Sequence, residues 1–208
     1  SKFVRRCRKR AVSLFYRRPK LSWTAAFAGA GIQVLLPILV LRTLGMSATQ
    51  LGVLLSAGAL GGILGAITRS AWITHLGIGR TIVATNILGV AILAFQPAAI
   101  HIPAWATWVI AASGIISSNF LTVYNATQMS LRQEICPPHM LGRMNAIFRF
   151  AVWGVMPLGS LASGVVAARV GVEAAMYAFI ALAIGAGIAM AFTPAARLSG
   201  ASADSAVP

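Results

Sequence analysis

The side chains that most often carry chemistry in proteins are few in this sequence and far apart. The three histidines, His75, His101 and His139, fall in predicted loops, and no cysteine or carboxylate stands at metal-ligand spacing from them. The sequence also contains no Ser-His-Asp arrangement supported by context, no phosphate-binding glycine loop and no carboxylate pair. We therefore expect no enzyme activity, no bound metal and no cofactor.

Polar side chains inside long apolar segments are the more informative group, because they are costly in lipid and should face protein or water. On the segment from about Ala104 to Met129 they recur every three or four positions, which places them on one face of a helix. Two interpretations are open: the stripe lines a path for a solute, or it makes hydrogen bonds between helices. The stripe consists of Ser118, Thr122, Asn125 and Gln128, with Met129 beside Gln128, and it ends at Arg132.

The first apolar segment carries a single interior amide, Gln33, one turn before Pro37. A proline inside a helix leaves a backbone carbonyl without its donor and can kink the helix. We expect Gln33 and Pro37 to mark the wall of the same path.

A guanidinium also stands inside an apolar segment, the fifth, where an unpaired charge is costly. This residue, Arg149, can reach back to the headgroups, pair with Glu134 across a hairpin, or meet a partner outside this bundle. We expect it to act as a structural latch in preference to contacting a substrate. Arg69 in the second segment poses the same question, and there we expect the side chain to reach the headgroups. The face of Arg149 comprises Asn145, Arg149, Trp153, Met156 and Ser160.

Composition places the chain in a membrane. Of its 208 residues 58% are hydrophobic and 10% are charged, whereas soluble domains carry about a quarter charged residues. The net charge of +14 comes largely from positions 1–20, and the other basic residues are scattered, so we expect no nucleic-acid partner.

Six apolar runs are long enough to cross a bilayer, which needs about 20 residues per helix. We predict an all-α polytopic bundle at 21–192, preceded by a basic cytoplasmic linker at 1–20 and followed by a disordered cytoplasmic tail at 193–208. The bias of Lys and Arg puts both termini in the cytoplasm. The predicted spans are Leu21–Leu41, Gln50–Ile73, Thr81–Ile100, Ala104–Met129, Met144–Ala168 and Val172–Phe192.

Small residues four apart predict close helix packing in two of these spans. The second span has the pairs Gly58/Gly62 and Gly61/Gly65, and the fifth has Gly159/Ser163 and Ser160/Gly164. A Leu-Gly pair at 60 recurs at 158, 98 residues later, which indicates two three-helix units. Because each unit has an odd number of spans, the second is inverted in the membrane.

The stretch Tyr124–Gly164 gives the most specific signal. It holds, in order, Tyr-Asn, Gln-Met-Ser-Leu-Arg-Gln, Leu-Gly-Arg-Met-Asn-Ala, Arg-Phe, Trp-Gly and Met-Pro-Leu-Gly. This series of short motifs resembles the tenth-to-eleventh helix region of major facilitator superfamily transporters, closest to the bacterial branch with siderophore and macrolide exporters. The loop at 75–80 resembles the superfamily's Gly-x-x-x-Asp-x-x-Gly-x-Arg loop: Gly77 and Arg80 match its end, but the acidic residue is missing.

The resemblance implies a secondary transporter of the bacterial plasma membrane that exports a small molecule such as a drug or siderophore by antiport. The chain would be its C-terminal six-helix half, and its partners would be the lipid bilayer, the substrate and the missing N-terminal half. A membrane scaffold or assembly protein that transports nothing is the alternative. The substrate-cavity candidates are Gln33, Ser118, Thr122, Asn125, Gln128 and Trp153, and the structural or gating candidates are Gly77, Arg80, Arg132, Arg143, Asn145 and Arg149.

Overall fold

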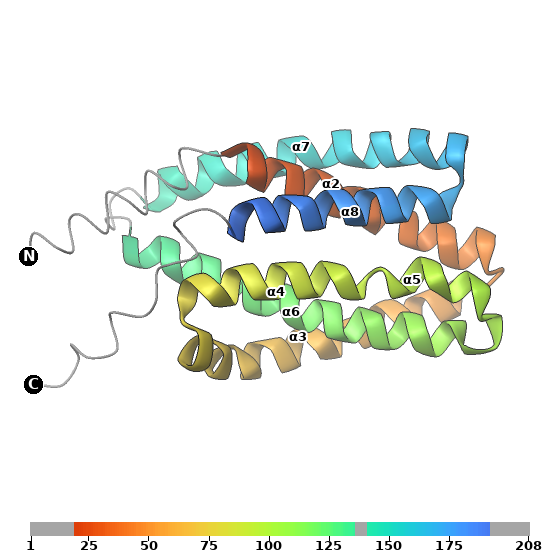
Figure 1. Cartoon of the computed structure of the whole chain (residues 1–208), viewed down its shortest axis with the longest axis horizontal. Coiled ribbons are helices and arrows are strands. Elements are labelled where there is room, and N and C mark those ends of the chain that lie inside the picture. Colours follow the sequence, from red (N-terminus) through yellow and green to blue (C-terminus); the bar gives the residue numbers. More distant parts are fainter. Residues whose placement is uncertain (1–18, 136–140, 192–208) are drawn as a thin grey trace, which may run out of the picture.

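The computed structural model describes residues 19–135 and 141–191, and every regular element in these ranges is helical. Six stretches are long and apolar enough to cross a membrane, which confirms the predicted all-α polytopic bundle. They run back and forth along one axis, so that the start of the first helix and the end of the last lie at the same end (Figure 1). The long helices are α2 (Pro19–Ile38), α3 (Ala48–Leu76), α4 (Ile78–Ile92), α6 (Ala106–Ile135), α7 (Leu141–Val170) and α8 (Val172–Ala191).

The third span is not the single helix that its hydropathy predicted. α4 ends at Ile92, and a turn leads to the short helix α5 (Phe95–Ala98) and a 3₁₀ turn, η2 (Ala99–His101). At the break, Leu93 and Ala94 donate to carbonyls three residues back instead of four, and Pro97 has no amide hydrogen to restore the regular ladder. The whole stretch Ile78–His101 still has the length and hydropathy of one span.

The far end of the first span is irregular. Pro37 lies inside α2, and a π-helical turn, η1 (Leu39–Thr43), follows directly after Ile38. Such wider turns interrupt the regular hydrogen-bond ladder of an α-helix. The first span therefore changes its helical register near this end of the bundle.

The hairpin between the fourth and fifth spans is shorter than predicted, because α6 continues to Ile135 and α7 starts at Leu141. Cys136 and His139 lie outside the described residues. So do the predicted linker at 1–20, apart from its last two residues, which belong to α2, and the predicted tail at 193–208.

Glycine determines how closely α3 approaches α6. A Cβ on Gly61 would overlap the backbone carbonyl of Ile115, and one on Gly65 would overlap that of Asn119. The two helices therefore touch backbone to backbone, as small residues four apart allow. Trp72 of α3 packs edge-on against Phe120 of α6, with ring centres 5.6 Å apart.

The α2–α7 pair repeats this arrangement. A Cβ on Gly159 of α7 would overlap the carbonyl of Phe27 on α2, and Ser163, one turn further on, is fully buried. These contacts confirm the predicted packing role of Gly159/Ser163. The second predicted pair does not pack: Gly164 has no atom within 4 Å of its would-be Cβ, and Ser160 donates to the Met156 carbonyl of its own helix.

The predicted internal repeat is present in the packing and in the turns. α2 packs on α7 and α8 as α6 packs on α3 and α4. Gly77 and Gly171 each form the one-residue turn between the second and third helices of a unit, with φ of +75° and +90°. Each donates to the carbonyl four residues back, and the carbonyl of each accepts from the amide four residues on.

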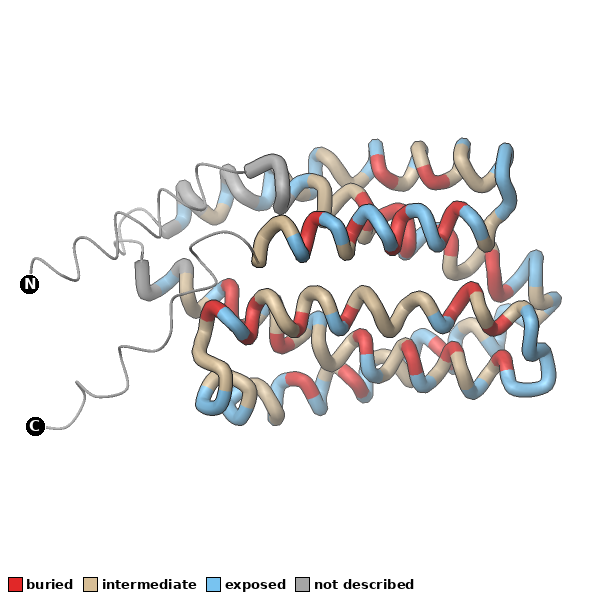
Figure 2. Tube along the Cα trace, viewed as in Figure 1, coloured by how far each residue is buried: buried red, intermediate tan, exposed pale blue. Residues whose placement is uncertain are grey.

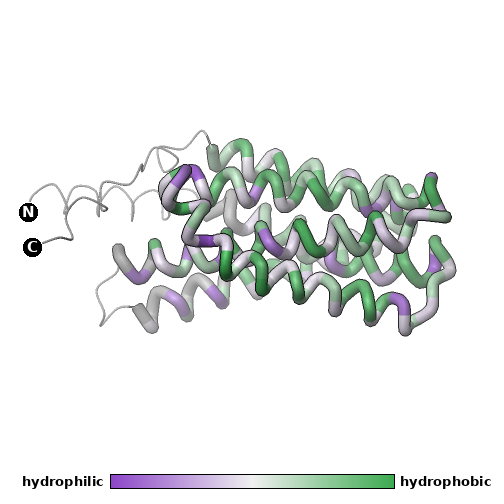
Figure 3. The backbone as a smooth tube through the Cα atoms, turned by 90° about the horizontal axis from the view of Figure 1, so that it is seen from below, coloured by the Kyte–Doolittle hydropathy of each residue, from purple (hydrophilic) through white to green (hydrophobic). Residues whose placement is uncertain are grey.

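The described helices pack in the spatial order α7, α2, α8, α4, α6, α3, and α7 and α3 form no extensive contact that closes this row. Buried residues follow the inward faces of the helices (Figure 2). One core cluster joins α2 to α8, where Phe27 stacks on Phe179 with ring centres 5.8 Å apart. Apolar colour extends along most of each tube, as expected of surfaces that meet lipid (Figure 3).

Candidate functional site

The predicted polar stripe on α6 divides into three environments. Ser118 and Thr122 face α3, where their hydroxyl oxygens would lie 3.4 and 3.5 Å from a Cβ on Gly58 and Gly62. Asn125 is exposed, and Gln128 is buried with 4% of its surface accessible. The structure thus places the first two residues at a helix–helix contact, and of the stripe only Asn125 is an exposed polar group.

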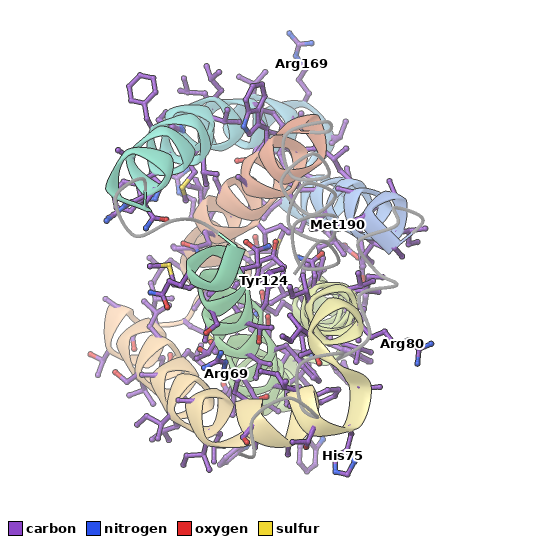
Figure 4. All side chains as sticks on the ribbon, turned by 90° about the vertical axis from the view of Figure 1, so that its left-hand side faces the viewer. Arg69, His75, Arg80, Tyr124, Arg169 and Met190 are labelled. Carbon is purple, nitrogen blue, oxygen red and sulfur yellow. The ribbon has the colours of Figure 1, made fainter. Side chains whose placement is uncertain are left out.

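Hydrogen bonds between α3 and α6 come from neighbours that the sequence did not single out. The Asn119 amide donates to Thr68 Oγ1 at 3.4 Å, and the Arg69 guanidinium donates to Ser130 Oγ. Arg69 therefore does not follow the expectation that it reaches the headgroups: it is half-buried and turned toward α6, whereas Arg80 and Arg169 point away from the bundle (Figure 4). Periodicity within one helix could not reveal this pairing, because it joins two helices.

Gln33 is exposed near the middle of the first span, Trp23–Thr43. On the same helix Gly31 faces Phe179 of α8. At about 100° per residue, Gln33 points nearly opposite to Gly31 and hence away from α8.

Arg149 and Trp153 are brought together one turn apart on α7. The guanidinium carbon lies 4.9 Å from the centre of the indole ring, a cation–π contact. Both residues are exposed, Trp153 with 62% of its surface accessible. The alternative partner Glu134 has a side chain outside the described part of the structure, so the latch role of Arg149 stays a prediction.

The remaining gating candidates mark turns. Gly77 caps α3 and begins α4 with a positive φ that favours glycine, and Arg80, one turn later, is exposed. Asn145 is half-buried at the start of α7. The side chains of Arg132 and Arg143 lie outside the described ones.

At the opposite end of the bundle His101 and Glu173 form a hydrogen bond, with Nε2 and Oε1 2.9 Å apart. It ties the turn after α5 to the first turn of α8. The two residues are 72 positions apart, so only the fold brings them together.

We infer that five exposed side chains of α2, α3, α6 and α7 lie on one side of the bundle, which we call the open flank: Gln33, Leu55, Asn125, Arg149 and Trp153. Asn125 follows Ser118 by seven residues, about two turns, and so points to the edge where α6 meets α3. The 98-residue repeat that relates Gly61 to Gly159 also relates Leu55 to Trp153, and these two have similar exposure, 56% and 62%. Both stand beside the tight contact of their own helix pair. Viewed end-on, α7 and α3 lie at opposite ends of the molecule, with the other helices between them (Figure 4).

Within the described ranges, no group of three or more His, Cys, Asp or Glu side chains is placed to hold a metal ion. What the open flank offers is two neutral amides, an aromatic ring and one cation on a largely apolar bundle. Such groups can contact a solute by hydrogen bonds and stacking.

Six apolar helices in two repeated units define a multi-pass membrane protein. The sequence model of the transmembrane secretion effector family, within the major facilitator superfamily, matches residues 17–206. The chain belongs to this family. Neither curated proteins nor solved structures gave a match.

Proposed function

We propose that this chain is the C-terminal six-helix half of a major facilitator exporter that moves a small amphipathic molecule out of a bacterial cell. The family match supports a membrane transporter, and the resemblance of Tyr124–Gly164 to the efflux branch supports the direction. Exchange for a proton or another ion is part of the proposal.

The observation that carries the proposal is the open flank. Gln33 and Asn125 are amides exposed within apolar spans, where a polar group facing lipid would be unfavourable. A water-filled path between this bundle and a second one would satisfy both of them. Trp153 adds an exposed aromatic surface on α7.

The second bundle is inferred from the same geometry. Alternating access in this class of transporter uses two six-helix bundles that rock about a site between them. Helices α3 and α7 stand at the two ends of the row and are the least covered: 17% and 11% of the residues in their most apolar stretches are buried, against 39% for α2 and α8. We assign a six-helix partner to the side that α3 and α7 leave uncovered. We also place both termini in the cytoplasm, because a basic segment such as 1–20 stays on that side under the positive-inside rule.

The test compares two substitutions on α6 in the complete transporter. Asn125→Leu removes the exposed amide, whereas Thr122→Val removes a hydroxyl that faces glycine and keeps the shape of the side chain. Cells without their main efflux pumps are loaded with N-phenyl-1-naphthylamine, a neutral fluorescent amphipath, and its accumulation is measured at matched protein levels. We expect Asn125→Leu to abolish most export and Thr122→Val to retain it.

Ser56→Leu, an exposed change on α3 about 100° around the helix from Leu55, serves as a further control. Normal export by Asn125→Leu would exclude the amide from the path. If the wild-type protein exported no probe from a panel of amphipaths, a non-transporting scaffold would be favoured. The 208-residue chain alone, in proteoliposomes with an imposed pH gradient, should move no solute, and movement would contradict the need for a second bundle.

A further inference from the structure

The cation on the open flank stands among uncharged groups. The guanidinium of Arg149 lies over the ring of Trp153, and the other members of the flank are two amides and Leu55. Stacking on the ring fixes one face of the guanidinium and leaves its N–H donors free to point outward in their plane.

No carboxylate in the described part of the chain compensates this charge. Glu173 is the one acidic residue whose side chain is described there, and it pairs with His101 at 2.9 Å. The stretch of α7 from Arg149 to Val170 alone is about 30 Å long. Glu173 follows the far end of that stretch and is out of reach of Arg149.

The Arg149–Trp153 pair suits a ligand that has an anionic group at one end and an apolar body at the other. Arg149 precedes Trp153 by one turn on α7, so a cation and an aromatic ring stand next to each other along the helix. The planar fork of donors of the guanidinium matches a carboxylate, sulfonate or phosphate group. The indole face next to it matches an apolar or aromatic body.

Arg149 does not lie on the outermost side of α7. Gly159 faces α2, and Phe150, nine residues earlier, points in the opposite direction with 84% of its surface exposed. Arg149 is turned about 100° away from Phe150 around the helix axis, which leaves it exposed at the margin of the packed face of α7.

We propose that Arg149 and Trp153 bind the anionic group of an amphipathic organic anion, which is the substrate class of this transporter. The inference rests on the proposed transport function and specifies its ligand. Arg149 contacts the anion directly, and Trp153 both orients the guanidinium and covers the adjacent apolar part of the ligand.

The test measures binding of two fluorescent probes to the complete transporter in nanodiscs of zwitterionic phosphatidylcholine. One is anionic, 1-anilinonaphthalene-8-sulfonate, and the other, N-phenyl-1-naphthylamine, is its neutral analogue. Because charge-assisted hydrogen bonds contribute strongly to affinity, Arg149→Gln should weaken the sulfonate about tenfold or more and leave the neutral probe unchanged. Arg149→Lys should show an intermediate loss, since it keeps the charge without the planar fork. Arg169→Gln, an exposed arginine in the last turn of the same helix, should change neither affinity.

The outcomes distinguish a failure of the proposed anion site from a failure of the proposed transport function. Equal sulfonate affinity in wild type and Arg149→Gln would overturn the anion site while leaving transport intact. A wild-type protein that binds neither probe would contradict the transport path itself. Displacement of the sulfonate by a few mole percent of phosphatidylglycerol, lost in Arg149→Gln, would reassign the site to an anionic lipid and overturn the assignment to a solute.

Discussion

Gly61 and Gly159 occupy positions at which any side chain would collide with the backbone of a neighbouring helix. Close approach of this kind replaces the hydrophobic driving force that helices lack inside a membrane, because it gains van der Waals contact along the whole crossing. The same two positions are related by the internal repeat. At the residue scale, the close approach of these helices thus depends on the missing methyl groups of Gly61, Gly65 and Gly159.

We expect Gly61→Ala and Gly159→Ala each to destabilise the bundle by about 1–3 kcal/mol, the usual cost of overpacking a tight contact. Thermal unfolding in detergent, followed by fluorescence-detected size exclusion, measures the effect. Gly114→Ala is the matched control, because a Cβ there has no atom within 4 Å. A similar melting temperature for all three variants would show that the helices adjust to the extra methyl group.

Helices α3 and α4, and equally α7 and α8, are joined by a single residue. A one-residue connection reverses the chain only with a positive φ, and Gly77 and Gly171 supply it at +75° and +90°. This element fixes how the second and third helices of each unit lie relative to each other. The turn also gives a structural reason for the glycine that this loop shares with the superfamily motif, Gly77, although the acidic residue of the motif is missing.

Gly77→Ala and Gly171→Ala should each cost about 1–3 kcal/mol, because an L residue in this backbone region is strained. We expect lower yields of folded protein and a lower melting temperature, measured as above. Gly52→Ala, a helical glycine with open space around its Cβ, should be neutral or slightly stabilising. Wild-type stability in both turn variants would mean that the turns can relax to a negative φ.

At the scale of the whole molecule, the ends of the bundle have different chemistry. One end carries the His101–Glu173 pair and the exposed aromatic rings of Phe95, Trp105 and Trp108. The other carries Arg80, the start of α2 and the end of α8 (Figure 1). On the basis of the positive-inside rule, we propose that the first end faces the outside of the cell.

This topology predicts which positions an impermeant thiol reagent reaches. After replacement of Cys7 and Cys136, single cysteines at His101 and Glu173 should react from outside intact cells. A cysteine at Arg80 should react only after permeabilisation. Protection of both outer positions, or labelling of Arg80 in intact cells, would reverse the orientation.

The sequence by itself determined the number, type and approximate limits of the spans, since hydrophobic length and the cost of unpaired backbone groups in lipid allow little else. It also indicated that Gly61, Gly65 and Gly159 pack and that the two halves repeat, because both patterns are periodic along the chain, but it wrongly included Gly164 among the packing glycines. Only the tertiary structure decided which neighbour each face meets. Ser118 and Thr122 belong to one polar stripe in sequence but face the glycines of α3, Arg69 finds Ser130 on another helix, and His101 finds Glu173 across 72 residues. One-dimensional periodicity gives the direction of a side chain about its own helix axis, whereas its partner depends on how two helices are rotated and offset against each other, which is a property of the packed bundle.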